Sequence, residues 1–222
     1  MNNYNQVTMS SEAPIENSEC IVKVKETGQR WTDSILKEET TKTKPGSISH
    51  LLYGEKPSEQ SINIKFGRLG EVLAKELVKT NPDLELLTCG VQKIGGSKKK
   101  DVDLIWIDKE NKVIYYRELK GNIELDTEKL PATINKCREI EASLKEKYPD
   151  CTINSGVLNW SVYNRQILTA GVSNIKGFEN GGVKIDHMGD FLRCVGVVWL
   201  EDDFYAYFRT LGTRINLLFG NK

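Results

Sequence analysis

Apolar residues along the chain change their spacing from one segment to the next, and each spacing predicts a different element. Between residues 64 and 78 they recur every three or four positions, which is typical of one face of an amphipathic helix. Apolar stretches at 102–107 and 113–119, separated by a polar segment, predict two strands joined by a hairpin turn. A long charged helix is predicted at 133–148, with Pro149 at its end.

The rest of the chain gives shorter signals. They predict a strand at 85–92, a glycine turn at 95–97, a strand at 153–158, an irregular Gly- and Asn-rich region at 174–182 and an aromatic strand at 204–208. Residues 1–60 are polar and lack sustained periodicity, so we expect an N-terminal arm with short helical pieces near Trp31 and Leu51. Residues 61–222 are expected to form one domain. This order of elements predicts an α/β fold in which helices flank a central mixed sheet.

The composition is that of a globular protein. The chain has 222 residues, of which 39% are hydrophobic and 28% charged, enough for one core and a polar surface. No run approaches the roughly 20 apolar residues that span a bilayer, and the first residues lack the apolar centre of a signal peptide. We therefore expect a cytoplasmic protein without a membrane partner. Thirty-one basic and 31 acidic residues give zero formal charge, which argues against a purely electrostatic, sequence-blind binder of nucleic acid.

Cysteine and histidine are too sparse for several kinds of site. The five cysteines are scattered, so the sequence offers no zinc ribbon, redox CxxC motif or disulfide framework. His50 and His187 are the two histidines, and we expect both to be structural or solvated.

The candidate chemistry is concentrated in the predicted hairpin at 101–121. Side chains alternate along a strand, so Glu118 and Lys120 should share one face, and the hairpin should bring Asp103 or Asp101 beside them. Carboxylate oxygens are ligands that Mg²⁺ prefers, and the Leu119 backbone carbonyl offers one more. A solvated ion pair on an edge strand is the alternative interpretation. Charged groups at the buried end of an apolar strand are costly, however, which favours a functional role.

Asp103, followed fifteen residues later by Glu118-Leu119-Lys120, resembles the D…(D/E)xK signature of the PD-(D/E)XK nuclease superfamily, whose best-known members are type II restriction endonucleases. The upstream segment at 67–71 resembles the one from which many members contribute a further acidic residue, here Glu71. The segment at 118–130 also resembles restriction-enzyme sequence, and the resemblance covers roughly residues 64–164.

Two features of the motif depart from the family pattern. Val102 stands where the pattern has proline, and Asp101, seventeen residues before Glu118, competes with Asp103 for the same role. We prefer Asp103 because it directly adjoins the apolar strand.

The resemblance implies a restriction-endonuclease-like core and Mg²⁺-dependent hydrolysis of double-stranded DNA that leaves 5′-phosphate and 3′-hydroxyl ends. It implies that Asp103 and Glu118 bind the metal, that Lys120 positions the water, and that Glu71 is an outer-shell or second-metal ligand. A homodimer acting on a short palindrome is expected, with a cognate DNA methyltransferase implied by the resemblance alone.

Several residues outside the motif are candidates for DNA contacts. Lys98, Lys99 and Lys100 precede the acidic strand, where they are placed to meet the DNA backbone. The candidates for base reading are Asn159, Asn164, Arg165 and Gln166, with 174–190 as a recognition loop and 164–222 as a recognition or dimerisation region. Trp160 and Tyr163 are expected in the core or an interface.

Two other functions stay open. A repair or Holliday-junction-type nuclease of the same superfamily would read DNA shape, although such enzymes are often strongly basic. A non-catalytic DNA-binding module would keep the fold without the chemistry.

Overall fold

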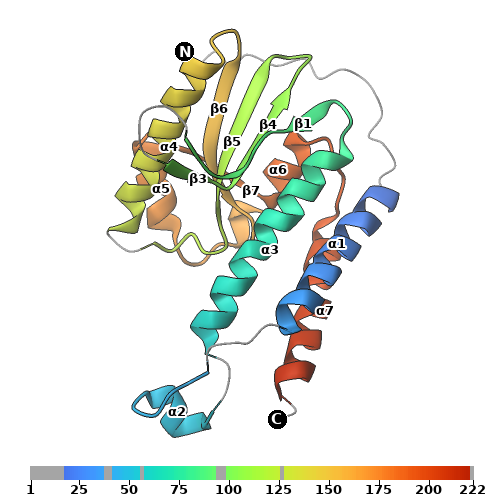
Figure 1. Cartoon of the computed structure of the whole chain (residues 1–222), viewed down its shortest axis with the longest axis vertical. Helices are drawn as coiled ribbons and strands as arrows, with labels where there is room; N and C mark the ends of the chain where they lie inside the picture. Colours follow the sequence, from blue (N-terminus) through green and yellow to red (C-terminus); the bar gives the residue numbers. More distant parts are fainter. Residues whose placement is uncertain (1–17, 38–41, 56–57, 94–98, 126–127, 221–222) are drawn as a thin grey trace.

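The computed structural model describes residues 18–37, 42–55, 58–93, 99–125 and 128–220 (Figure 1). In these residues three helices come first, five strands follow, and helices and strands then largely alternate. The elements are α1 (Ser18–Lys37), α2 (Ile48–Tyr53), α3 (Glu59–Thr80), β1 (Leu84–Leu86), β2 (Gly90–Lys93), β3 (Lys99–Val102), β4 (Leu104–Asp108), β5 (Val113–Lys120), α4 (Lys129–Lys147), β6 (Thr152–Asn159), the 3₁₀ turn η1 (Arg165–Ile167), α5 (Val172–Asn180), β7 (Lys184–His187), α6 (Met188–Cys194) and α7 (Glu201–Gly220).

Five strands form the central sheet, in the order β1-β4-β5-β6-β7. The pairs β1/β4 and β4/β5 are antiparallel, whereas β5/β6 and β6/β7 are parallel. Strands β2 and β3 form a separate antiparallel pair. The predicted α/β fold with a central mixed sheet and flanking helices is confirmed, as is the β4–β5 hairpin, in which Leu104 pairs with Arg117 and Asp108 with Val113.

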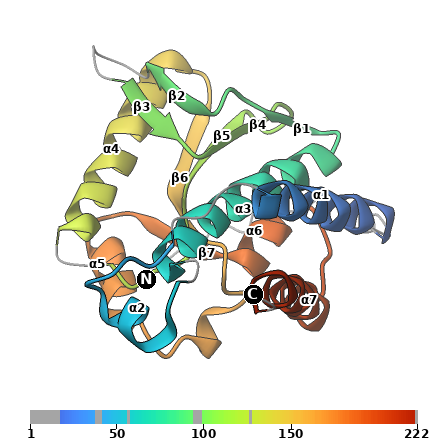
Figure 2. The ribbon, with the colours of Figure 1, turned by 60° about the horizontal axis from the view of Figure 1, so that its bottom comes forward.

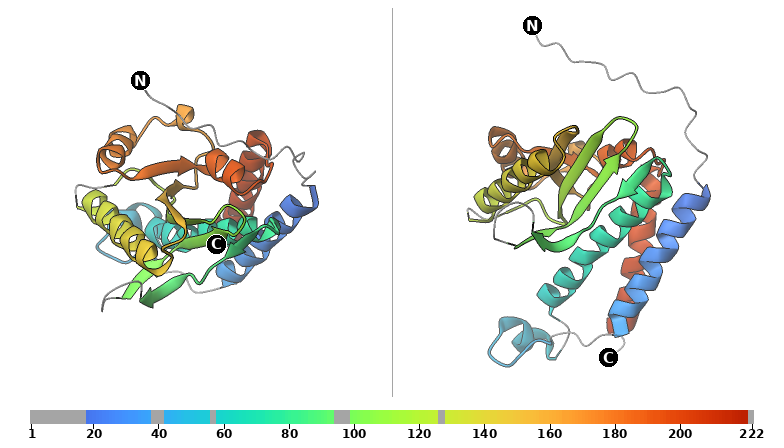
Figure 3. Two further views of the ribbon diagram at one scale, coloured as in Figure 1. Left: turned by 90° about the horizontal axis from the view of Figure 1, so that it is seen from above. Right: turned by 45° about the horizontal axis from the view of Figure 1, so that its top comes forward.

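Helices cover both faces of the sheet, as Figures 1 and 2 show. On one face α3 and α6 pack on the strands, and α1 lies against both α3 and α7 (Figure 3). The other face is covered by α4 and α5. Each face has its own apolar core: the first includes Leu69, Leu73, Leu77, Trp106 and Phe191, and the second Ile105, Ile114, Ile140, Val157 and Phe178.

The N-terminal region contains a longer helix than the short pieces predicted. Helix α1 has 20 residues, and its buried face includes Val24, Gly28 and Thr32. A Cβ on Gly28 would lie 2.1 Å from the Tyr207 hydroxyl oxygen, so glycine allows α1 to approach α7. Ile21, Val24 and Trp31 do have a helical spacing, but Gly28 and Thr32 on the same face interrupt the run of apolar residues. The second expected piece is present as α2, which projects beyond the end of α3 (Figure 1).

Two predictions for the C-terminal third were wrong. The expected strand at 204–208 lies within α7, where Phe204 and Leu211, seven residues apart, are buried on one helical face. The region at 174–182 is not irregular, because Val172–Asn180 is the helix α5 with Ile175 and Phe178 buried. The segment at 174–190, expected as a recognition loop, therefore consists mainly of α5, β7 and the start of α6, and its role in DNA recognition stays a prediction.

The remaining predictions of helices and strands are confirmed in part. Helices α3 and α4 and strand β6 match their predicted positions within a few residues, with α3 five residues longer at its start. The strand expected at 85–92 is divided into β1 and β2, which belong to different sheets. The glycine turn at 95–97 lies outside the described residues. Within the described ranges, no helix is both long and apolar enough to cross a bilayer.

Candidate active site

Asp103, Glu118 and Lys120 meet at one end of the central sheet. Asp103 occupies the single-residue break between β3 and β4, and its Oδ2 accepts a hydrogen bond of 2.8 Å from the Leu119 backbone N–H. Glu118 and Lys120 lie on the same face of β5, and Lys120 Nζ donates to Glu118 Oε1 at 2.9 Å. The hairpin register thus brings the sequence-predicted trio together.

A second lysine, which the sequence pattern did not indicate, joins this cluster from α4. Lys136 Nζ lies 2.5 Å from Glu118 Oε2 and 3.7 Å from Asp103 Oδ1, so the ammonium group contacts both carboxylates. Glu118 Oε2 also accepts a hydrogen bond of 2.9 Å from the Tyr116 hydroxyl. The sequence places Lys136 directly before Cys137 and four residues before Ile140, on the side of the helix expected to be buried, but this position does not identify its partners.

The two carboxyl groups have opposite pKa shifts. Burial and the neighbouring Glu118 charge raise the pKa of Asp103 to about 7, against the attraction of Lys136. Burial also opposes ionisation of Glu118, but the ammonium groups of Lys120 and Lys136 outweigh it and lower the pKa of that carboxyl. Burial likewise disfavours the charged form of Lys136, and the two carboxylates outweigh it and raise its pKa. Glu118 is therefore the firmly ionised member of the pair, and Asp103 the member that takes up a proton near neutral pH.

The donor set fits a magnesium ion whose remaining ligands come from elsewhere. Within the part of the chain that the structure describes, no group of three or more Asp, Glu, His or Cys side chains could hold a metal. Mg²⁺, however, is often bound by one or two carboxylates together with waters and substrate phosphate oxygens. Asp103 and Glu118 supply two carboxylates at a point where an ammonium cation already sits. The cluster can therefore accept positive charge between these two side chains.

Asp101 and Asp103, the two candidates for the same role, occupy different surroundings. Asp101 is exposed on β3, paired with Val91 in the two-stranded sheet. Asp103 follows the end of that strand, and its side chain is 14% exposed. Between these two residues the chain leaves its pairing with β2 and begins to pair with β5. The Asp101 charge still reaches Lys136, whose pKa it helps to raise.

Glu71 lies on α3, near enough for its charge to act on Asp103. Its Oε2 forms an ion pair of 3.0 Å with Lys75 Nζ one turn later, and its negative charge contributes to the raised pKa of Asp103. The predicted additional carboxylate is therefore within electrostatic range of the pair.

The close approach of α3 to the end of β5 depends on glycine. The Trp160 ring packs against Gly70, where a Cβ would lie 2.3 Å from the nearest ring atom, and against Gly121, where the distance would be 3.1 Å. Trp160 is buried in the core, as expected. The indole thus fits between Gly70, next to Glu71 on α3, and Gly121, next to Lys120 at the end of β5. It thereby sets the spacing between α3 and β5.

A buried ion pair anchors β5 from the other face of the sheet. Arg117 is 1% exposed, and its Nε and Nη2 lie 2.8 and 2.7 Å from Asp186 Oδ2 on β7. Its Nη1 and Nη2 also donate to the backbone and side-chain oxygens of Asn154 on β6, at 2.7 and 2.9 Å. The guanidinium group therefore links three strands at the residue that precedes Glu118 and limits the movement of the carboxylate-bearing strand.

The structure describes two of the three lysines that we predicted to contact the DNA backbone. Lys98 lies outside the described residues, and Lys99 is exposed on β3. Lys100 forms an ion pair with Glu139 of α4. Their contact with a DNA backbone stays a prediction.

The candidates for base reading lie in different surroundings from one another. Asn159 is 1% exposed, so the prediction that it reads bases is contradicted: the end of β6 is covered by neighbouring elements. Asn164 donates to Glu201 Oε2 at 2.7 Å, and Arg165 pairs with Glu179 at 2.8 Å. Gln166 is exposed. Asn164 and Arg165 therefore tie the η1 region to α7 and α5, and a role in binding DNA stays a prediction.

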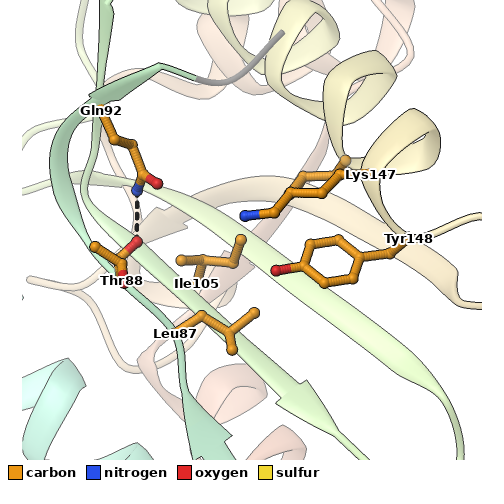
Figure 4. Close-up of a pocket in the computed structure, with 7 residues that line it drawn as sticks. Leu87, Thr88, Gln92, Ile105, Lys147 and Tyr148 are labelled. Atoms are coloured by element: carbon orange, nitrogen blue, oxygen red, sulfur yellow. Dashed lines mark hydrogen bonds between the residues drawn. The ribbon is translucent and has the colours of Figure 1, made fainter.

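A pocket on the α4 face lies apart from the carboxylates (Figure 4). Leu87 and Ile105 form its floor, while Lys147 and Tyr148 reach toward it from the end of α4. Lys136 stands eleven residues before Lys147, about 16 Å along a helix. The pocket is thus not part of the charged cluster.

Comparisons of the chain with protein-family models, curated proteins and solved structures found no match. Inference about function therefore depends on the geometry and charge of the cluster formed by Asp103, Glu118, Lys120 and Lys136.

Proposed function

We propose that the chain is a type II restriction endonuclease that cleaves double-stranded DNA in the cytoplasm with Mg²⁺, as a homodimer. The observation that carries the proposal is the placement of Asp103 and Glu118, two largely buried carboxyl groups, beside Lys120. Burying carboxylates is costly, and the raised pKa of Asp103 reflects that cost. A cluster that the fold maintains at such a cost is more readily explained by chemistry than by stability.

Each residue has a defined task in this proposal. Asp103 and Glu118 hold the metal, and Mg²⁺ when bound polarises the phosphate and increases the acidity of water. Lys120 orients the attacking water and offsets negative charge on the phosphate. The water oxygen forms a bond to phosphorus while the bond from phosphorus to the 3′ oxygen breaks. The attacking water loses a proton to solvent and the 3′ oxygen takes one up, so the products carry a 5′-phosphate and a 3′-hydroxyl.

Incubation of the pure protein with plasmid DNA and Mg²⁺ tests the proposal. We expect discrete fragments, and we expect EDTA to prevent their formation. Preference for four-way junctions over plasmid would instead support a junction-resolving nuclease. DNA binding without any cleavage would support a non-catalytic module, and either result would overturn the restriction-enzyme proposal.

The Lys120→Ala variant tests the site assignment. We expect the rate of DNA cleavage to fall by at least about 100-fold, because an organised positive charge beside the phosphate is lost. DNA binding, followed by fluorescence anisotropy, should be retained. Lys145→Ala is the matched control, since Lys145 is exposed farther along α4 and pairs with Glu141. An undiminished cleavage rate in Lys120→Ala would show that the site is wrongly assigned.

A further inference from the structure

Lys136 reaches the carboxylates along the buried side of α4. Its neighbours Thr133, Cys137 and Ile140 are buried against the sheet, so its side chain extends toward the sheet as well. The side chain is 24% exposed, and its ammonium group contacts Glu118 and Asp103. Lys120, by contrast, forms its ion pair with the other oxygen of Glu118. Of these two lysines, Lys136 is the one that contacts both carboxylates.

This position conflicts with a divalent cation. A cation held by Asp103 and Glu118 would stand next to the Lys136 ammonium, and like charges a few ångströms apart repel strongly in a partly desolvated site. Lysine has a flexible four-carbon side chain, so its ammonium group can leave while α4 stays in place. A nearby phosphate group is a favourable new partner, because the metal has by then neutralised the carboxylates.

We propose that Lys136 is a positioning residue that occupies the carboxylate pair before the metal binds and then moves to a phosphate of the DNA. This inference rests on the proposed function. Lys136 then weakens metal binding in the absence of DNA and makes metal and DNA bind cooperatively, because the displaced lysine gains a contact only when phosphate is present.

Calorimetric titration of the full chain with Ca²⁺, without DNA and in alkaline buffer in which both carboxylates are ionised, tests the first consequence. We expect Lys136→Gln and Lys136→Met to bind Ca²⁺ about tenfold more tightly than the wild type, since the competing cation is removed. Lys136→Arg and the matched control Lys145→Gln should bind it with nearly wild-type affinity. Thermal unfolding of each variant shows whether it is folded, and the methionine variant retains the apolar length of the side chain.

DNA binding tests the second consequence. With a fluorescein-labelled pool of random-sequence duplexes, we expect Ca²⁺ to strengthen binding about tenfold in the wild type and only about twofold in Lys136→Gln. An equal effect of Ca²⁺ on DNA binding by both proteins would overturn the inference.

The calorimetry separates failure of this inference from failure of the proposed function. If the folded Lys136→Gln and Lys136→Met variants bind Ca²⁺ no more tightly than the wild type, Lys136 does not compete with the metal, and the nuclease proposal stands. If the wild type and all variants bind no Ca²⁺ in calorimetry, and Ca²⁺ does not strengthen their DNA binding either, the carboxylate pair is not a metal site, and both proposals fall.

Discussion

Asp103 makes the folded chain less stable as the pH rises. Its pKa increases from 3.8 to about 7 on folding, because burial and the Glu118 charge oppose ionisation. A carboxyl with a raised pKa holds more protons in the folded than in the unfolded chain between these two values. The contribution of Asp103 to stability should therefore decline from about pH 4 to about pH 7, and above that range the folded chain bears the full cost of the ionised group.

The free-energy cost of ionising Asp103 in the folded chain follows from the same two pKa values. A change in pKa from 3.8 to about 7 corresponds to at most about 4 kcal/mol. Asp103→Asn removes that cost and keeps an oxygen that can accept from the Leu119 N–H, but it places the amide N–H₂ group beside the Lys136 ammonium, which costs about 2 kcal/mol at either pH. We expect a net stabilisation of about 2 kcal/mol near pH 8, about 4–8 °C in Tm, and almost none near pH 5.

Urea unfolding, followed by tryptophan fluorescence in EDTA at both pH values, measures this difference. Asp150→Asn is the matched control, because Asp150 is exposed just after α4, and its effect should stay within about 0.5 kcal/mol. The reasoning fails if Asp103→Asn gives no stabilisation near pH 8. It also fails if the gain is equal at the two pH values, since the cost would then not come from ionisation.

Two further predictions concern the supports of the site and use the same unfolding assay. Gly70→Ala would place a methyl group 2.3 Å from the Trp160 ring and should cost about 2–3 kcal/mol, whereas Gly67→Ala, one helical turn earlier, meets open space and should stabilise by about 0.5–1 kcal/mol. Equal effects would contradict the close approach of α3. Asp186→Ala leaves the buried Arg117 guanidinium without its carboxylate and should cost about 3–5 kcal/mol; a loss below about 1 kcal/mol would show that the pair does not anchor β5.

The sequence predicts those helices and strands in which apolar side chains recur at regular spacings. Helix α3 and the β4–β5 hairpin show regular spacings in neighbouring residues, and the structure confirms both. Helix α1 is different, since part of its contact with α7 uses Gly28. Aromatic residues such as Phe204 favour strands by propensity, but in α7 their helical spacing and burial against Trp199 decide the outcome.

The candidate site divides in the same way. Asp103, Glu118 and Lys120 could be brought together from sequence, because a hairpin register and strand alternation are local rules. Lys136 could not, because its approach to Glu118 depends on how α4 packs across the sheet, which no local pattern encodes. A lysine next to buried helix positions is more often a solvated side chain lying along apolar surface, and only the packed structure shows its partners.

Opposite charges cancel around the two carboxylates, as they do over the whole chain. When Asp103 is ionised, it and Glu118 are matched by Lys120 and Lys136, and nearby Glu71 is matched by Lys75. A cluster of this kind has little net charge with which to attract a polyanion. Arrival of a divalent cation would create the excess positive charge and release Lys136 beside it. Attraction of DNA phosphate to this end of the sheet should therefore depend on prior or simultaneous metal binding. The cluster would then bind DNA only when the metal needed for cleavage is present.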